Sequence, residues 1–194
     1  MTTTNLISLV SFITVNTTDT EHLELHPSFV RPTGAFTIQA IGKVMGETNG
    51  LDRYSVYGEQ NGNPYLLEIE ASDKKILGFI LYQNVLTITP EENQWPETIQ
   101  DITGIDIDLD SIHYRRSLGG DLPNTDLLEI MEEVKTHNDT YTCKNRIMQY
   151  ERPLFNETDE LLKVAVEVVE EKQQAQVSFY IGIQLHPSVL TIAG

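Results

Sequence analysis

The chain has 194 residues, with 13 Lys and Arg against 29 Asp and Glu, a formal net charge of −16, and one cysteine. The acidic balance argues against nucleic acid and anionic membranes as direct ligands, because neutralising phosphate requires clustered Lys and Arg. The single Cys143 excludes an internal disulfide framework and a cysteine-rich zinc site, whereas 40% hydrophobic residues are enough for a folded core.

The first 34 residues mix apolar and polar stretches. Their apolar run, Leu6–Val15, is too short to span a bilayer as a helix, and no basic residue precedes it because the first in the chain is Arg31. We expect this run to be a buried strand or short helix. We also expect a cytoplasmic protein that does not insert directly into a membrane.

Regular alternation of apolar and polar residues begins after residue 34. Phe36–Ile41, Tyr54–Gly58 and Tyr65–Ala71 each alternate in this way, and Asn61-Gly62 before the third segment is a hairpin signal. These segments predict three antiparallel strands. The continuously apolar Ile76–Tyr82 predicts a further strand that is buried on both faces.

Two segments in the middle of the chain carry helix signals. Thr89-Pro90-Glu91-Glu92 combines a capping box with proline at the first helical position, which predicts a helix beginning after Thr89. We expect this helix to be short because Pro96 follows Trp95. Residues 127–134 place Leu127, Ile130, Met131 and Val134 at helical spacing, which favours a second short helix.

The last part of the sequence has the clearest strand pattern. Residues 162–169 and 177–185 alternate strongly on either side of the polar residues 170–174, which predicts a β-hairpin. No linker or repeat divides the chain, so we expect a single domain over residues 1–194, with its core in residues 35–185 and uncertain packing of residues 1–34. The predicted fold is α+β and mostly β: antiparallel sheet with one or two short helices and a C-terminal β-hairpin.

An acidic strand is the first candidate for a functional surface. Asp106, Asp108 and Asp110 alternate with apolar residues, and a turn at Asp110-Ser111 leads into a second short strand, Ile112–Arg116. The calcium-loop pattern fails here, because its sixth and twelfth positions hold Ser111 and Ser117 instead of Gly and Glu. The aspartates are therefore interpreted as a solvated strand face, with an acidic docking surface as the alternative.

Three scarce arginines end predicted strands: Arg115 and Arg116 after Tyr114, and Arg152 after Glu151. In an acidic, sheet-rich protein such arginines usually pair with carboxylates in a structural network, here with the strand that carries Asp106 to Asp110. A site for an anion or for a partner's carboxylate is the alternative.

The sequence gives little support for a metal site or for a catalytic nucleophile. His22, Glu24 and His26 share one face of an extended chain, but a zinc site needs a third placed ligand, and nothing places His113, His137 or His186 beside them. Lys144 and Arg146 near Cys143 could lower the pKa of its thiol, although a small buried side chain is the commoner role. No nucleophile elbow, phosphate loop or dinucleotide fingerprint occurs.

Three stretches of this sequence resemble the bacterial YjfK-like domain-of-unknown-function proteins. They contain Ile41-Gly42-Lys43 with Tyr54–Tyr57 and Tyr65–Ile69; Leu81-Tyr82 with Thr89–Glu92 and Trp95; and Arg146–Arg152 before the closing hairpin. The resemblance covers most of residues 35–185 and implies no established activity. It implies a small cytoplasmic protein, gene neighbourhoods that point to envelope or membrane-stress functions, and an extended chain at residues 127–134.

From these observations we expect a non-catalytic interaction or adaptor module without a cofactor. Its partner would be a basic or mixed-charge protein rather than nucleic acid, and self-association through an uncovered sheet edge is a further possibility. The interaction surface would include Asp106, Asp108, Asp110, Arg115, Arg116 and Arg152. The alternative is a carboxylate-dependent hydrolase, with or without a divalent metal.

Overall fold

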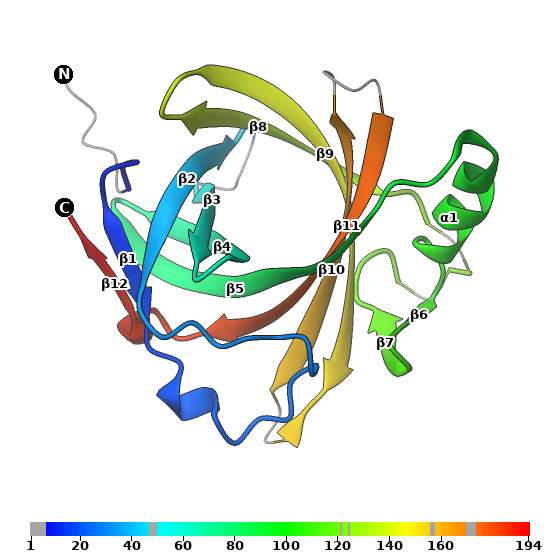
Figure 1. Ribbon diagram of the computed structural model, residues 1–194, viewed down its shortest axis with the longest axis horizontal. Helices are drawn as coiled ribbons and strands as arrows, with labels where there is room; N and C mark the ends of the chain where they lie inside the picture. The colour runs from blue at the N-terminus through cyan, green and yellow to red at the C-terminus, as the bar shows by residue number, and fades with distance from the viewer. Residues whose placement is uncertain (1–6, 47–49, 121, 124, 156–157, 170–173) are drawn as a thin grey trace.

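Eight antiparallel strands pair in a closed ring at the centre of the computed structural model, which describes residues 7–46, 50–120, 122–123, 125–155, 158–169 and 174–194 (Figure 1). The order around the ring is β2-β3-β4-β5-β11-β10-β9-β8, and β8 pairs with β2 to close it. The eight strands are β2 (Ala35–Val44), β3 (Asp52–Gln60), β4 (Asn63–Ser72), β5 (Lys75–Ile88), β8 (Leu128–Thr136), β9 (Thr140–Pro153), β10 (Asp159–Val169) and β11 (Gln174–Leu185).

Short elements extend the ring at two places. β1 (Phe12–Val15) pairs with β2 and carries β12 (Leu190–Ala193), and β7 (Ile112–Arg116) pairs with β9 and carries β6 (Asp106–Leu109). In Figure 1, β1 and β12 lie on one side of the ring, and β6, β7 and the helix α1 lie on the other. The helical segments are η1 (Thr18–Thr20), η2 (Glu92–Gln94), α1 (Trp95–Asp101) and η5 (Pro187–Val189).

The predicted antiparallel, mostly β architecture with a short helix is confirmed. The predicted C-terminal hairpin is β10 and β11, paired from Glu160 with Ile183 to Val169 with Gln174. The three strands expected in residues 36–71 are β2, β3 and β4, in consecutive antiparallel pairs. The sequence patterns do not predict that the sheet closes on itself.

The predicted helix start at Thr89 is wrong. Residues 89 and 90 precede the helical segment, and the reciprocal capping contacts form between Glu91 and Gln94 at the start of η2. Pro96 does not end a helix but lies in the first turn of α1, where its missing N–H has no intrahelical partner to lose. No helix in the described part of the chain has the length and apolar character needed to cross a membrane.

Residues 127–134 are extended rather than helical, as the family resemblance implies and contrary to their helical spacing. They form most of β8, which pairs with β2 on one side and β9 on the other. Both edges of the strand are therefore hydrogen-bonded, and Glu132 and Val134 are buried. Long-range pairing outweighs a local preference that rests on four apolar residues.

The described residues form two apolar clusters, one inside the ring and one outside it. The inner cluster is small and contains Leu66, Tyr82, Ile147, Leu161, Ala165 and Tyr180. The outer cluster is much larger and includes the alternate residues of the same strands, such as Leu162, Val164 and Val166 of β10. β10 is thus buried on both faces, which explains why residues 161–166 are apolar at every position except Lys163.

The N-terminal segment, whose packing the sequence leaves uncertain, covers the outer cluster. Ile13, Leu23 and Phe29 are buried in that cluster. Backbone N–H groups of the segment donate to side chains on the ring: His26 N to Glu160 Oε1 (2.5 Å), Val30 N to Gln83 Oε1 (2.5 Å) and Thr33 N to Gln60 Oε1 (2.8 Å). Polar groups of a chain without regular structure are thereby satisfied where they are removed from water.

Gly182 of β11 provides a test of packing inside the ring. It lies opposite Tyr82 of β5, and a Cβ atom at position 182 would overlap the Tyr82 ring. We expect Gly182→Ala to lower the free energy of unfolding by about 1–3 kcal/mol, because the buried ring must move. Urea unfolding measures this change.

Gly78→Ala is the matched control. No described atom lies within 4 Å of a Cβ atom built at Gly78. This substitution should be neutral or stabilise the protein by up to about 0.5 kcal/mol through the unfolded chain. Equal destabilisation by the two substitutions would show that the Tyr82 contact does not constrain position 182.

Candidate functional site

A cavity of about 670 Å³ opens inside the ring of strands, and all eight strands contribute to its wall. This volume lies in the range of small-molecule sites, and an eight-stranded barrel is wide enough to hold one small ligand. The apolar residues whose side chains share the inner face are Val44, Met45, Ile80, Leu128, Ile130 and Ile147, whereas Ile69 and Phe79 border the cavity but pack their side chains into the outer cluster. Met45 and Leu128 are half exposed, at 50% each, so the cavity is open to solvent at this rim.

Glu132 is a buried carboxylate in the cavity wall. It is 3% exposed and accepts hydrogen bonds from three neutral donors: the Ser55 hydroxyl, the Tyr57 hydroxyl (3.0 Å) and the Asn145 amide (3.0 Å). Gly42 of β2 makes room for this carboxylate, because a Cβ atom there would lie 3.1 Å from Glu132 Oε2. Four strands therefore hold one acidic group in place.

The other charged side chains of the wall form ion pairs. Lys163 contacts Glu68, and its ammonium lies 5.9 Å from the centre of the Tyr82 ring. Arg53 Nε lies 3.0 Å from Glu70 Oε1. Both pairs join residues on the inner side of the ring, so their charges cancel within the cavity.

Glu129 at the rim binds two basic residues of β9. Lys144 Nζ lies 2.7 Å and Arg146 Nε 3.3 Å from its two oxygens, and the Lys144 hydrogen bond lowers the pKa of Glu129. Lys144 and Arg146 therefore do not activate Cys143 as their position in the sequence suggests. Burial raises the pKa of the Cys143 thiol, and the nearby carboxylates of Glu132 and Glu167 raise it further.

A second buried carboxylate, Glu160, lies on the outer face of β10. It is fully buried and accepts from His26 N, from the Tyr114 hydroxyl (2.8 Å) and from Arg152 Nε (2.5 Å). Arg152 also donates to the Glu24 carbonyl (2.8 Å). This cluster ties the N-terminal segment to β7, β9 and β10, so Arg152 has a structural role.

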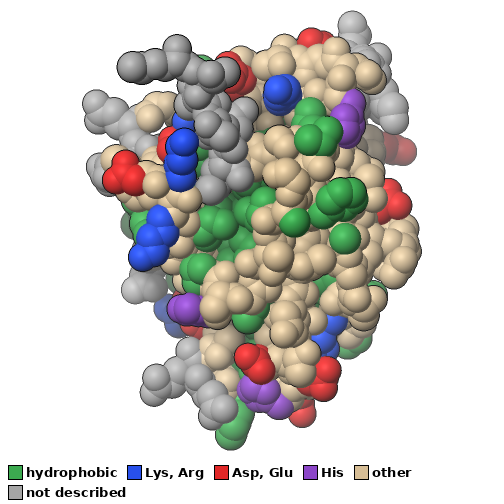
Figure 2. Space-filling model, turned by 90° about the vertical axis from the view of Figure 1, so that its left-hand side faces the viewer, with side chains coloured by type: hydrophobic (Ala, Val, Ile, Leu, Met, Phe, Trp, Pro, Cys, Tyr) green, Lys and Arg blue, Asp and Glu red, His purple; other side chains and the backbone are tan. Residues whose placement is uncertain are grey.

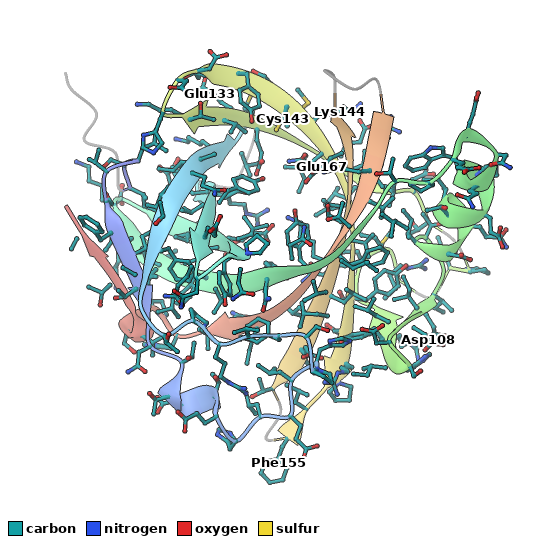
Figure 3. The ribbon with its side chains drawn as sticks, viewed as in Figure 1. Asp108, Glu133, Cys143, Lys144, Phe155 and Glu167 are labelled. Atoms are coloured by element: carbon teal, nitrogen blue, oxygen red, sulfur yellow. The ribbon has the colours of Figure 1, made fainter. Side chains whose placement is uncertain are left out.

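The three aspartates expected as an interaction surface lie on the β6–β7 hairpin. In Figure 3, Asp108 lies on the opposite side of the molecule from Glu133 of β8. His113 lies between Asp106 (3.5 Å) and Asp108 (3.0 Å), and Arg115 faces Asp106 in the hairpin register. The side chains of Asp108 and Asp110 are 70% and 72% exposed, so this hairpin presents a solvated acidic face.

Arg116 is buried, unlike the exposed aspartates. Its guanidinium donates to the carbonyls of Thr103 (2.6 Å), Gly104 (3.2 Å), Gly120 (3.0 Å) and Leu122. It thereby organises the loop after β7. The six residues expected as one surface thus fall into an exposed hairpin and two arginines engaged in internal contacts.

The structure separates the histidines that the sequence places together. His26 is buried, with Nε2 3.7 Å from Asp110 Oδ2, whereas His22 is exposed. In the described part of the chain, no group of three His, Cys, Asp or Glu side chains is arranged to hold a metal ion.

Comparison with known proteins places the chain in a family. A model for proteins of unknown function, DUF2491, matches residues 7–191. The chain belongs to the DUF2491 family. No curated protein and no solved structure matches it. The match begins at residue 7 and includes the segment that covers the outer cluster, and the family supplies no activity that could be assigned to this chain.

The cavity residues of this DUF2491 protein were difficult to find from its sequence. Lys163 carries a visible signal, because it is the one charged residue between Leu161 and Val166. Glu132 carries none, because it occupies the polar side of a pattern that looks helical. Ser55, Tyr57 and Asn145 are ordinary polar residues of alternating strands until the ring brings them to Glu132.

Burial of tyrosines in the DUF2491 protein predicts alkaline destabilisation. Burial raises the pKa of seven of its eight tyrosines above the usual value of 10, and it raises that of Tyr150 to about 12. The seven are Tyr57, Tyr65, Tyr82, Tyr114, Tyr141, Tyr150 and Tyr180. The native state therefore retains protons that the unfolded state loses.

The change in stability with pH depends on the difference between the folded and unfolded pKa values of these tyrosines. Because the folded pKa values are raised, their contribution to stability is complete below pH 10 and is lost as the pH rises from about 10 to 12. Denaturant unfolding at several pH values should show this fall, and absorbance at 295 nm should show tyrosine ionisation coinciding with unfolding. Ionisation of all eight tyrosines near pH 10 in a folded protein would contradict the prediction.

Proposed function

We propose that this protein is a non-catalytic binding module that holds a small ligand inside its barrel. The observation that carries the proposal is the cavity of about 670 Å³, which has an apolar wall and a few fixed polar groups. Such a combination is typical of ligand sites, in which apolar surface provides affinity and polar groups orient the ligand.

Binding is favoured over the alternative, carboxylate-dependent hydrolysis. The wall contains four carboxylates that hydrolysis could use, of which Glu70 is paired with Arg53 and Glu129 with Lys144 and Arg146. Glu68 is paired with Lys163, and Glu132 accepts from three donors. A general acid must give its proton to the substrate, and groups held as hydrogen-bond acceptors in this way are poorly suited to that role.

Filling the cavity provides the test. Ile130 lies on the wall, so Ile130→Trp should place a large ring in the space where a ligand binds. We expect the neutral fluorescent probe N-phenyl-1-naphthylamine to bind the unmodified protein saturably. Its affinity should fall roughly tenfold or more in the variant, a change of at least ~1.4 kcal/mol.

Leu77→Trp is the matched control, because Leu77 is 47% exposed on β5 and is not among the residues of the cavity wall. It adds the same ring without filling the cavity, and its affinity for the probe should match that of the unmodified protein. Thermal unfolding of both variants checks that the fold is retained. Equal probe binding by the two tryptophan variants would place the probe elsewhere and contradict the proposal.

Docking of a basic or mixed-charge protein is a second proposal. Its support is the net charge of −16 together with the exposed aspartates of the β6–β7 hairpin. The cytoplasmic location and the link to envelope processes, which rest on the sequence and the YjfK-like resemblance, are proposals as well. A homo-oligomer through β12, the outermost strand on its side of the sheet, would use the face in Figure 2, where apolar side chains gather.

Charge removal tests the protein-partner proposal. A partner captured at low salt should be released as salt is raised, because exposed charges are screened. Changing Asp106, Asp108 and Asp110 to Asn should prevent capture. Changing the exposed Asp19, Glu21 and Asp139 to their amides alters the net charge equally and should leave capture intact. Equal loss with both triple variants would show that total charge, and not the hairpin, attracts the partner.

A further inference from the structure

The charges in the cavity wall point to one chemical class of ligand. We propose that the cavity binds a cationic amphiphile, a small molecule with an ammonium group and an apolar chain, and that the ammonium group pairs with Glu132. This inference rests on the proposed binding function and specifies the ligand of that same site.

The basic groups of the wall argue against an anionic ligand. Arg53 and Lys163 are the basic residues among those that line the described cavity, and each is already paired with a carboxylate. Lys144 and Arg146, near the rim, share Glu129. An anion would have to break one of these pairs and leave a carboxylate without its partner, which costs free energy in a partly desolvated site.

The acidic groups of the wall leave one charge without a basic partner. The wall contains two basic and four acidic residues, a formal net charge of −2. Glu129 binds basic residues at the rim, and Glu68 and Glu70 have partners in the wall. Among the described residues no basic side chain pairs with Glu132, although it is 3% exposed. Its donors are neutral, so they stabilise the carboxylate without cancelling its charge.

Glu132 also retains room for one more donor. Among the described residues, Oε2 accepts from Tyr57 and Asn145, whereas Oε1 accepts from Ser55 alone. A carboxylate has about four acceptor sites, so one site on Oε1 is left for a ligand. A charged N–H donor there would form a strong hydrogen bond and supply the missing positive charge.

The wall next to Glu132 suits an apolar chain. Ile130 precedes Glu132 on the same face of β8, and Ile147 and Ile80 line the cavity with it. Leu128, two residues before Ile130 on the same face of β8, continues this apolar surface to the rim, where it is 50% exposed. A chain lying along these residues would extend from the buried carboxylate to the opening.

A series of ligands that differ only in the head group tests the proposal. Octylammonium, 1-octanol and octanoate have the same chain length and carry a positive charge, no charge and a negative charge at pH 7. Isothermal titration of the full-length protein should give the order octylammonium, octanol, octanoate. We expect octylammonium to bind at least about tenfold more tightly than octanol.

Glu132→Gln removes the charge and keeps the size of the side chain. It should reduce the affinity for octylammonium to that for octanol and leave octanol affinity unchanged within about twofold. Asp108→Asn is the matched control, because it removes one charge from an exposed site on β6 and should preserve the preference for octylammonium. If Glu132→Gln does not fold, Ser55→Ala keeps the carboxylate and should preserve that preference, while the order of the three ligands on the unmodified protein remains decisive.

The outcomes separate this inference from the function on which it rests. Octanol or octanoate binding as tightly as octylammonium would keep the binding function and overturn the cationic ligand. A preference for octylammonium that survives Glu132→Gln, or that disappears equally in Asp108→Asn, would overturn the role of Glu132. No binding by any member of the series, together with no binding of the naphthylamine probe, would overturn both.

Discussion

The pairing of β8 with β2 is the interaction on which the rest of the structure depends. Residues Ala40 to Val44 pair with Thr136 to Glu132 and thereby join the two ends of an eight-stranded sheet. Without this pairing the sheet would have two open edges and an exposed inner face. With it, Glu132 and Val134 become interior residues, and the inner side of every strand faces a common space.

The placement of the larger apolar cluster outside the ring explains how the interior can hold a cavity. In many small barrels interior side chains fill the barrel and provide its core. Here the outer faces of β4, β5, β10 and β11 are buried beneath the N-terminal segment, α1 and the added strands, and they supply most of the apolar core. Stability therefore does not require a filled interior, and the inner wall can carry charged and hydrogen-bonding groups such as Lys163 and Glu132.

The alternation of apolar and polar residues predicted those elements of the fold that depend on neighbouring segments of the chain. Hairpins whose two strands are neighbours in sequence, such as β3–β4 and β10–β11, were visible as alternating runs around a polar break. The conformation of residues 127–134 and the closure of the ring depend on pairing between segments about 90 residues apart. No periodicity within either segment reports that pairing, and for the same reason Glu132 could not be recognised as an interior residue.

The position of Glu132 determines which substitutions there can change ligand binding without destabilising the fold. Glu132 lies on the closing strand and is held by β3 and β9 through Ser55, Tyr57 and Asn145. Truncating it would leave buried donors without an acceptor and would weaken the closure of the barrel together with any ligand contact. An amide of the same shape retains an acceptor oxygen and fits the space that Gly42 provides, so it changes the charge of the cavity with the least change in packing. Removing only the charge of Glu132 therefore distinguishes a structural role of this residue from a role in ligand binding.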